Sequence, residues 1–518
     1  MSALAGIRPM LALTIRRERL HAPAWYGLVG VLLVLLGAGT VATYPTEASR
    51  LGLAESVSRS AGELFLIGPV ISTDVGGIVL WRTLGNAAIF TSLASIVTVV
   101  RNTRAAEEGG AYELLGSAPV GRAAPLATAL GVAAAGSVLT GLLASLGLLA
   151  LGAATPGSIL VGAQVVSFGL LAASVAGLTG QLVRTGRAAT GVSVAVVIVC
   201  YLLRGVADAT NRSAADWLSP FSWIVAVRPF TVADVAMLLP AALLAALLGA
   251  GALGIAARRD LGAGLLPDRS GPAYASAALR GPLSLALRVS RATILGWVTG
   301  ATVVGLLIGA VASTVDEQIG LELGGGTGGG AGLVQVALYL SPLAAAVLGI
   351  QTTLQLRGEV TSGRAEAVLS RPVHRGRWLL AHTITGALAS MSVLLGFGLG
   401  LGLAGASSHP GAIVSLSVAA AVRAPAAWVF VALASLLVVT APRAATAMTF
   451  AVLGAFLALE LTVEFHLAPP QALYASPFAL VPQLPAGPGH LGQVLLLLAI
   501  TLGLTALGTR LLRGRDVR

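Results

Sequence analysis

Long apolar stretches dominate the chain and recur between short charged or Gly/Pro-rich breaks. A helix that crosses the hydrocarbon core of a membrane needs about 20 mostly apolar residues, and the stretches are of that order. The pattern therefore predicts twelve membrane-spanning helices in two sets of six. The first set is expected at about 24–44, 76–100, 124–152, 156–183, 188–207 and 232–256, and the second at about 292–314, 333–355, 378–404, 411–440, 444–463 and 491–511.

The two sets are related in sequence. Arg187-Ala-Ala-Thr190 recurs as Arg443-Ala-Ala-Thr446, and Ser219-Pro-Phe221 recurs as Ser476-Pro-Phe478, at separations of 256 and 257 residues. A nearly constant offset indicates a duplicated unit. Because each unit would contain six helices, both copies would have one orientation and form a parallel repeat.

These patterns predict an all-α integral membrane protein built as a pseudo-dimer. We expect a cytoplasmic interfacial helix at 1–23, a first six-helix half at 24–256, a Pro/Gly/Arg-rich cytoplasmic linker at 257–291, a second half at 292–511 and a cytoplasmic tail at 512–518.

Composition and charge support a membrane location. The chain is 56% hydrophobic and 10% charged, whereas soluble domains are about one quarter charged. Its 32 basic residues are all arginine, and with both termini in the cytoplasm 25 of them fall inside and seven outside. This bias obeys the positive-inside rule. We therefore expect a multi-pass protein of the bacterial cytoplasmic membrane, bound to lipid rather than to nucleic acid, since no basic-aromatic groove accompanies the arginines.

The sequence argues against an enzyme. It contains no lysine, and a Walker A loop needs a lysine to neutralise the phosphates of ATP. It contains one cysteine and six scattered histidines, and no hydrolase motif or metal-ligand spacing is present. We expect no catalytic residue, no metal site and no cofactor in this chain.

Two predicted cytoplasmic loops, 101–122 and 357–375, have similar sequences. Tyr112 and Leu115 lie three residues apart on one face of a short predicted helix, and Pro119 would end that helix. The loops could be ordinary solvated connections, but a duplicated acidic helix with an apolar edge favours a docking element. At an offset of 253, five residues of the first loop recur unchanged in the second: Arg104, Gly110, Glu113, Pro119 and Arg122.

The segment from Arg104 to Leu115, followed by Pro119-Val-Gly-Arg122, resembles the loop after the second helix of ABC type-2 exporter permeases. The double-length form resembles the actinobacterial permeases that export polyketide and polyether antibiotics, the tetronasin-like group, and related multidrug efflux systems. The second copy departs from the pattern, because Val360 and Thr361 stand where the first has Glu107 and Glu108.

This resemblance implies a permease that moves a lipophilic compound out of the cell. Two copies of a separate ABC ATPase subunit, which bind ATP and Mg²⁺, would dock on the two loops and drive alternating access. The residues expected to couple to the ATPase are Glu107, Glu108, Tyr112, Glu113, Leu114 and Arg122 in the first loop, and Arg364, Glu366, Leu369 and Arg375 in the second.

Four charges near predicted outer helix ends are candidates for the pathway or for contacts between the halves. Asp74 and Arg82 bracket the start of the second helix, while Arg204 and Glu460 are 256 residues apart at equivalent positions. Intramembrane charges usually need partners, so Arg204 and Glu460 could pair. They could equally be ordinary interfacial residues.

The leading alternative is a proton-coupled drug antiporter of the major facilitator type, which also has two parallel six-helix repeats. Such carriers usually have an intramembrane carboxylate and a Gly-x-x-x-Asp-Arg-x-Gly-Arg-like loop, and neither is evident here. A membrane-embedded transferase is a more distant alternative, because no acidic cluster is found at a predicted interface.

Overall fold

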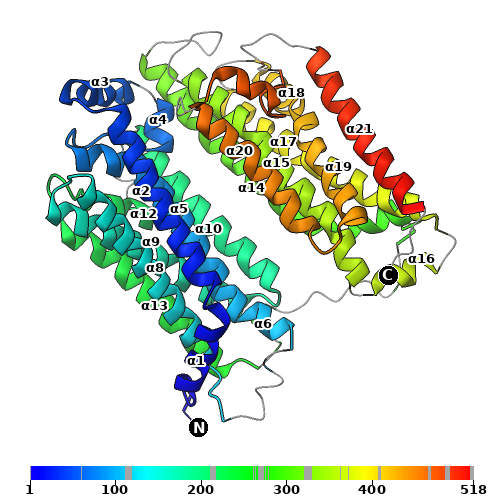
Figure 1. Cartoon of the computed structure of the whole chain (residues 1–518), viewed down its shortest axis with the longest axis horizontal. Coiled ribbons are helices and arrows are strands. Elements are labelled where there is room, and N and C mark those ends of the chain that lie inside the picture. The colour runs from blue at the N-terminus through cyan, green and yellow to red at the C-terminus, as the bar shows by residue number, and fades with distance from the viewer. Residues whose placement is uncertain are drawn as a thin grey trace. The chain divides into compact units, whose positions relative to one another are not determined.

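The computed structural model forms two compact units, Met1–Ser270 and Gly271–Arg518. Every regular element in the described part of the chain is a helix (Figure 1). The residues described are 2–59, 61–110, 112, 119–210, 217–260, 262, 264–266, 274, 276–277, 279–319, 330–361, 363–370, 373–406, 410–464, 468–482, 484 and 491–513.

In the first unit, α9 lies centrally and contacts α5, α8 and α13, while α2 packs on α5 and α8. Figure 1 shows α1 and α6 at one end of this unit and α3 and α4 at the other. Its helices are α1 (Ile7–Glu18), α2 (His21–Thr43), α3 (Glu47–Ser58), α4 (Ala61–Leu66), α5 (Val75–Asn102), α6 (Arg104–Glu108), α8 (Ala124–Ala150), α9 (Thr155–Leu182), α10 (Gly186–Thr210), α12 (Pro220–Val225), the 3-10 turn η1 (Val235–Met237) and α13 (Leu238–Arg258).

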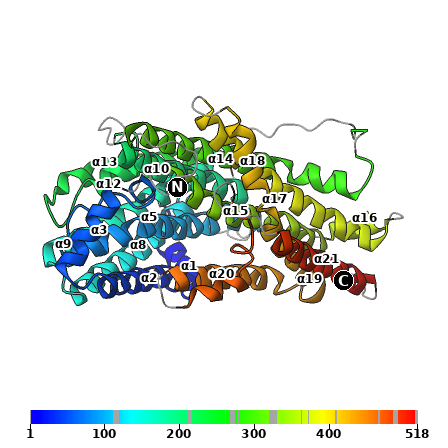
Figure 2. The ribbon, with the colours of Figure 1, turned by 90° about the horizontal axis from the view of Figure 1, so that it is seen from above.

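In the second unit, α17 contacts α14, α15, α18 and α19, and α19 also packs on α21. Figure 2 gives a second view of these helices. They are α14 (Pro282–Ile319), α15 (Gly330–Thr361), α16 (Arg364–Leu369), α17 (Arg375–Gly405), α18 (Ala412–Ala421), α19 (Ala424–Thr440), α20 (Ala445–Glu464), the 3-10 turn η2 (Pro470–Ala475) and α21 (Leu491–Arg513).

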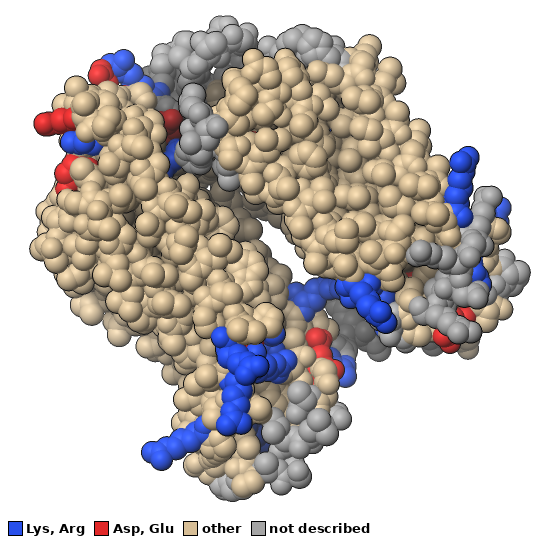
Figure 3. All heavy atoms as spheres, viewed as in Figure 1, with Lys and Arg blue, Asp and Glu red and all other residues tan. Residues whose placement is uncertain are grey.

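Within the described residues, 11 spans are long and apolar enough to cross a membrane. Eight of these lie within single long helices, and the other three combine α5 with α6, η1 with α13, and α18 with α19. The last predicted segment, 444–463, coincides with α20, in which the shorter stretch Ala445–Glu460 is apolar. On the face shown in Figure 3, the charged side chains of the first unit gather at its two ends and leave the helices between them uncharged. The fold is that of a multi-pass membrane protein.

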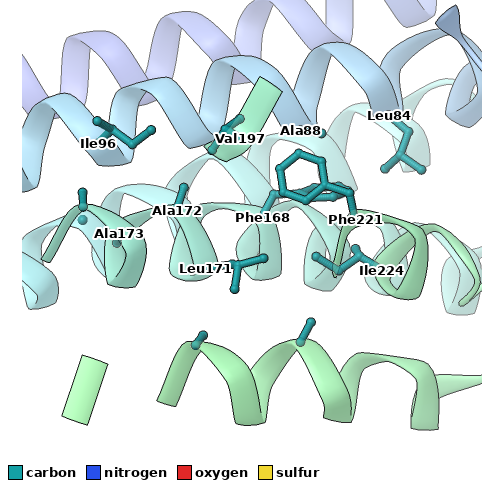
Figure 4. Packing of buried hydrophobic residues seen from close by; sticks show 14 of the residues in the cluster. Leu84, Ala88, Ile96, Phe168, Leu171, Ala172, Ala173, Val197, Phe221 and Ile224 are labelled. Carbon is teal, nitrogen blue, oxygen red and sulfur yellow. The ribbon is translucent and has the colours of Figure 1, made fainter. Parts of the chain in front are cut away.

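Small residues bring the helices into backbone contact. A Cβ atom at Gly400 of α17 would lie 2.0 Å from the carbonyl oxygen of Thr302 on α14, and one at Gly162 of α9 would lie 2.2 Å from Ser145 Oγ on α8. Without a hydrophobic effect between helices in lipid, such close packing is a main source of association. Larger side chains then fill the core of the first unit, where the rings of Phe168 and Phe221 meet edge to face at 4.8 Å (Figure 4).

The structure departs from the predicted helix at 411–440, which is broken between α18 and α19. Arg423 lies at the break and is fully buried. Its guanidinium donates to the carbonyl of Ala419 and, at 3.1 Å, to that of Leu484. Pro425 in the first turn of α19 suits a new helix start, because proline needs no backbone donor there.

Candidate functional site

A buried ion cluster fixes the connection between α5 and α8. Glu107 of α6 accepts hydrogen bonds from Arg104 and Arg259, each at 2.9 Å, and from the backbone N–H of Gly262. The exposed side-chain fractions of Arg104, Glu107 and Arg259 are 1%, 9% and 10%. We call these three residues the Arg104–Glu107–Arg259 cluster.

The same arginines also bind the end of α9. Arg104 Nε donates to the carbonyl of Val183, directly after α9, and Arg259 Nε donates to Gln181 Oε1 within α9, both at 2.9 Å. Because Arg259 directly follows α13, the cluster joins α6 to α5, α9 and α13. The planar guanidinium suits such bridging, since it presents five donors in a fixed geometry.

Glu107 and Tyr112 were predicted to face a partner, but both side chains point into the first unit. Tyr112 is buried against Met10 of α1 and Ala106 of α6, and its hydroxyl donates to the carbonyl of Asn102. Burial raises the pKa of this phenol above its ordinary value. Leu115, the predicted i, i+3 neighbour of Tyr112, lies outside the described residues, so the shared helical face stays a prediction.

The exposed part of the first loop is smaller than predicted. Glu108 is exposed, and Arg122 is exposed with its Nη1 3.3 Å from Asp260 Oδ1. A pair this open to solvent contributes little to stability. Glu113 and Leu114 lie outside the residues that the structure describes.

Helix α1 is attached to this loop. The backbone N–H groups of Gly121 and Ala123 donate to the carbonyls of Ala5 and Ala3, at 2.8 and 3.0 Å. At the other end of α1, the buried Glu18 accepts a 3.0 Å hydrogen bond from Asn102 Nδ2 at the end of α5. The predicted interfacial segment is therefore held against the end of the first unit that carries α6.

In the second unit, α16 occupies the corresponding loop. Arg364 and Glu366 are exposed, Ala365 between them is buried, and Arg375 begins α17 half-buried. Leu369 is the last residue of α16, and its side chain lies outside the description. Among the described residues of the loop, Glu366 is the exposed carboxylate, at the position equivalent to Glu113.

The internal contacts of the two loops differ. Arg357, the counterpart of Arg104, donates to Thr446 Oγ1 at 2.9 Å. Glu359 Oε2 lies 3.3 Å from His382 Nε2 and accepts from Trp378 Nε1 at 3.1 Å. This buried acidic and basic pair ties α15 to α17 within the second unit.

The four predicted end charges have partners within their own units. Asp74 caps α5 by accepting from the Gly77 N–H at 2.6 Å. Arg82 lies over the Trp81 ring, with its guanidinium carbon 5.8 Å from the centroid. Arg204 and Glu460, which could pair across the halves or be ordinary interfacial residues, also have partners of their own.

Arg204 is 3% exposed and pairs with Asp208 on the same helix at 3.0 Å. It also donates to the carbonyls of Ile67 and Phe65. Glu460 accepts from Ser476 Oγ at 2.5 Å. Both groups thus have partners in their own units, although Arg204 Nε has none among the described residues, and the pairing of Arg204 with Glu460 stays a prediction.

Comparison with known proteins places the chain in a family. A family model described as the C-terminal domain of the multidrug efflux system permease Rv1217c matches residues 279–513. The multidrug efflux system permease protein Rv1217c of Mycobacterium tuberculosis is 33% identical over 530 residues, covering 100% of this chain and 96% of the relative. The chain belongs to the Rv1217c family of efflux permeases.

Membership of the Rv1217c family confirms the part of the prediction that concerned membrane efflux systems. The alignment covers both units, so the likeness does not depend on one loop motif. It supports a transporter component rather than an enzyme.

Sequence reasoning missed several residues that organise this member of the Rv1217c family. Arg259 follows Glu107 by 152 residues, and no local pattern connects them. The Glu359–His382 pair was also missed, although a glutamate and a histidine among apolar residues at the ends of two predicted helices were a usable signal. Arg423 gave the same kind of signal within a predicted span.

Proposed function

We propose that this chain is the transmembrane permease subunit of an ATP-driven ABC exporter that moves a lipophilic compound out of the cell. Two copies of a separate ATPase subunit, carrying ATP and Mg²⁺, dock on the loops that contain α6 and α16. The protein lies in the bacterial cytoplasmic membrane with both termini inside, as a twelve-helix pseudo-dimer of the type-2 architecture.

The need for a partner rests on chemistry. An efflux permease must be driven by some energy source, and this chain has no lysine for a Walker A site. The relative from M. tuberculosis is named as one protein of a multidrug efflux system, which suits a complex assembled from separate chains.

The observation that carries the proposal is how the first loop is attached. The Arg104–Glu107–Arg259 cluster joins α6 to the ends of α5, α9 and α13. A push applied at the exposed Glu108 is therefore transmitted to three long helices, rather than absorbed by a flexible loop. In the second unit α16 directly precedes α17 and contacts α15.

Replacing the repeated carboxylates tests this coupling. We expect the double substitution Glu113→Gln and Glu366→Gln to uncouple ATP hydrolysis from export, because both removed charges are assigned to the docking surface. Export by the complex should fall at least about tenfold, while the permease itself stays folded. The measurement pairs export with the ATPase activity of the purified complex.

Glu55→Gln is the matched control, since Glu55 is an exposed glutamate on α3, at the other end of the first unit. It should leave export unchanged. Unchanged export and unchanged assembly in the double variant would refute the assignment of the two loops.

A proton-coupled antiporter is the second candidate, and the buried Glu359–His382 pair is the observation that favours it. Paired titratable groups inside helices are typical of proton relays. If protons drive export, Glu359→Gln abolishes it while loss of the ATPase does not. If ATP drives export, export by the wild-type chain stops when the ATPase is lost.

A further inference from the structure

The first unit encloses a cavity of about 290 Å³ between the segment before α5, the start of α5, the end of α10 and α12. This volume is roughly at the lower end of small-molecule sites. Leu84, Ala88, Phe168 and Phe221 in Figure 4 all line it. Aromatic side chains form much of the remaining wall: Trp81, Tyr201, Trp217, Trp223 and Phe230.

Three hydrogen-bond donors on this wall have no partner among the described residues. They are the buried Nε1 of Trp223, Oγ of Ser222 and Nε of Arg204. Other donors nearby are used, since Trp81 Nε1 donates to the Gly68 carbonyl at 2.7 Å and the Tyr201 hydroxyl donates to Leu66. Buried polar groups in folded proteins are nearly always paired with protein or with ordered water, so three donors without a protein partner indicate that the cavity can hold an acceptor, either water or a ligand.

Among the described residues of the wall, the buried charges near these donors are paired. Asp208 also lines it, but its Oδ2 lies 3.0 Å from Arg204 Nη1. Arg228 lies at the wall with an exposed side chain. The buried part of the site therefore offers aromatic faces and neutralised charge, together with N–H and O–H donors.

The repeat shows that the fold does not require these donors. At offsets of 256 and 257 residues, Arg204, Ser222 and Trp223 correspond to Glu460, Ala479 and Leu480. The second unit keeps the surrounding Ser-Pro-Phe motif, yet there Ser476 donates to Glu460, whereas Ser219 donates to the Cys200 carbonyl. One copy of the duplicated unit has thus kept or acquired a donor set that the other lacks.

We propose that this cavity binds the exported compound, and that the compound is a neutral, largely apolar molecule with carbonyl or ether oxygens. This rests on the export function proposed above and adds the substrate class. The aromatic walls stack on its apolar body, and Trp223, Ser222 and Arg204 donate to its oxygens. An acceptor-free hydrocarbon of the same shape leaves these donors unpaired and binds more weakly.

Benzophenone is a suitable probe, because it combines two aromatic rings with one carbonyl acceptor and inserts into nearby C–H bonds when illuminated. The full chain in lipid nanodiscs, without ATPase, is labelled and digested, and the labelled peptides are identified by mass spectrometry. We expect labels at residues 77–88 and 217–230. Fluorenone should compete with labelling at least about fivefold better than fluorene, which has the same frame without the oxygen.

The variant Trp223→Phe with Ser222→Ala removes two of the donors and keeps the cavity wall. Labelling should fall about fivefold, and efflux of fluorenone from cells should fall with it. Its thermal unfolding temperature should stay unchanged or rise, because the removed groups have no partner among the described residues. Trp25→Phe is the control, since Trp25 is exposed on α2.

Labelling outside the cavity, equal labelling of the double variant, or equal competition by fluorene would overturn the proposal. So would a double variant that loses labelling but exports fluorenone normally. Export that is independent of the ATPase contradicts the proposed function instead, and the labelling result is unaffected by it.

Discussion

Glu107 pairs with two buried arginines, Arg104 and Arg259. Its charge therefore contributes more to the stability of the protein than the charge of a surface glutamate. Glu107→Gln keeps the shape of the side chain and removes its charge. Two buried guanidinium groups then lose the carboxylate that they share, which we expect to cost about 3 kcal/mol. The thermal unfolding temperature in detergent should fall by several degrees.

Glu55→Gln again provides the comparison, because the Glu55–Arg59 pair has exposed fractions of 65% and 75%. Exposed pairs contribute little, so its unfolding temperature should barely change. Equal shifts for the two variants would show that the buried cluster does not stabilise the loop.

Whether the side chains of Glu107 and Tyr112 point to solvent or into the first unit depends on partners that are distant in sequence. Glu107 and Tyr112 lie in a motif that sequence reasoning recognised, but their partners include Arg259 and Met10. Local spacing fixes which residues share a face, and tertiary contacts decide whether that face meets solvent or protein. The exposure of Glu108 and Glu366 was consistent with the expected acidic surface.

At the scale of elements, the attachment of α1 depends on a glycine. A Cβ atom at Gly121 would lie 2.3 Å from the Ala3 carbonyl oxygen. Gly121→Ala should therefore loosen the start of the chain and α1 from the loop before α8. We expect faster tryptic cleavage after the exposed Arg16 and Arg17, measured by mass spectrometry on the folded protein.

Gly131→Ala is the matched control in α8, because a Cβ atom there meets nothing within 4 Å. Its cleavage rate should equal that of the wild type. If Gly121→Ala also cleaves at the wild-type rate, α1 is not held by these backbone contacts.

The packing of α14 on α17 depends on Gly400 in the same way. Gly400→Ala would place a methyl group 2.0 Å from the Thr302 carbonyl and force the helices apart. We expect a loss of about 1–3 kcal/mol, typical of overpacking, seen as a lower unfolding temperature. Gly454→Ala in α20 has open space, so that substitution should be neutral or slightly stabilising.

Most long helices could be predicted because each needs only a run of apolar residues, and α5, α8 and α9 begin and end within about two residues of expectation. The break at Arg423 could not be predicted. That arginine is buried because its guanidinium donates to the carbonyls of Ala419, in the preceding turn, and of Leu484, which is distant in sequence. The aromatic cavity could not be predicted either, since its wall combines residues that are distant in sequence, from the segment before α5 and from α5, α9, α10 and α12.

For the whole molecule, the duplicated units are not equivalent in detail. The first has the Arg104–Glu107–Arg259 cluster and the donor-lined cavity, while the second has the Glu359–His382 pair. The proposed fused pseudo-dimer permits divergence of this kind, because each half can change without the other. It is consistent with one half specialising in ligand contacts.

The most direct test of the proposed function is export by the complex with the Walker lysine of its partner ATPase replaced. We predict that the ATPase co-purifies with this chain and that export falls at least about a hundredfold in that complex. Export that persists without ATP hydrolysis and collapses when a protonophore is added would contradict the proposal.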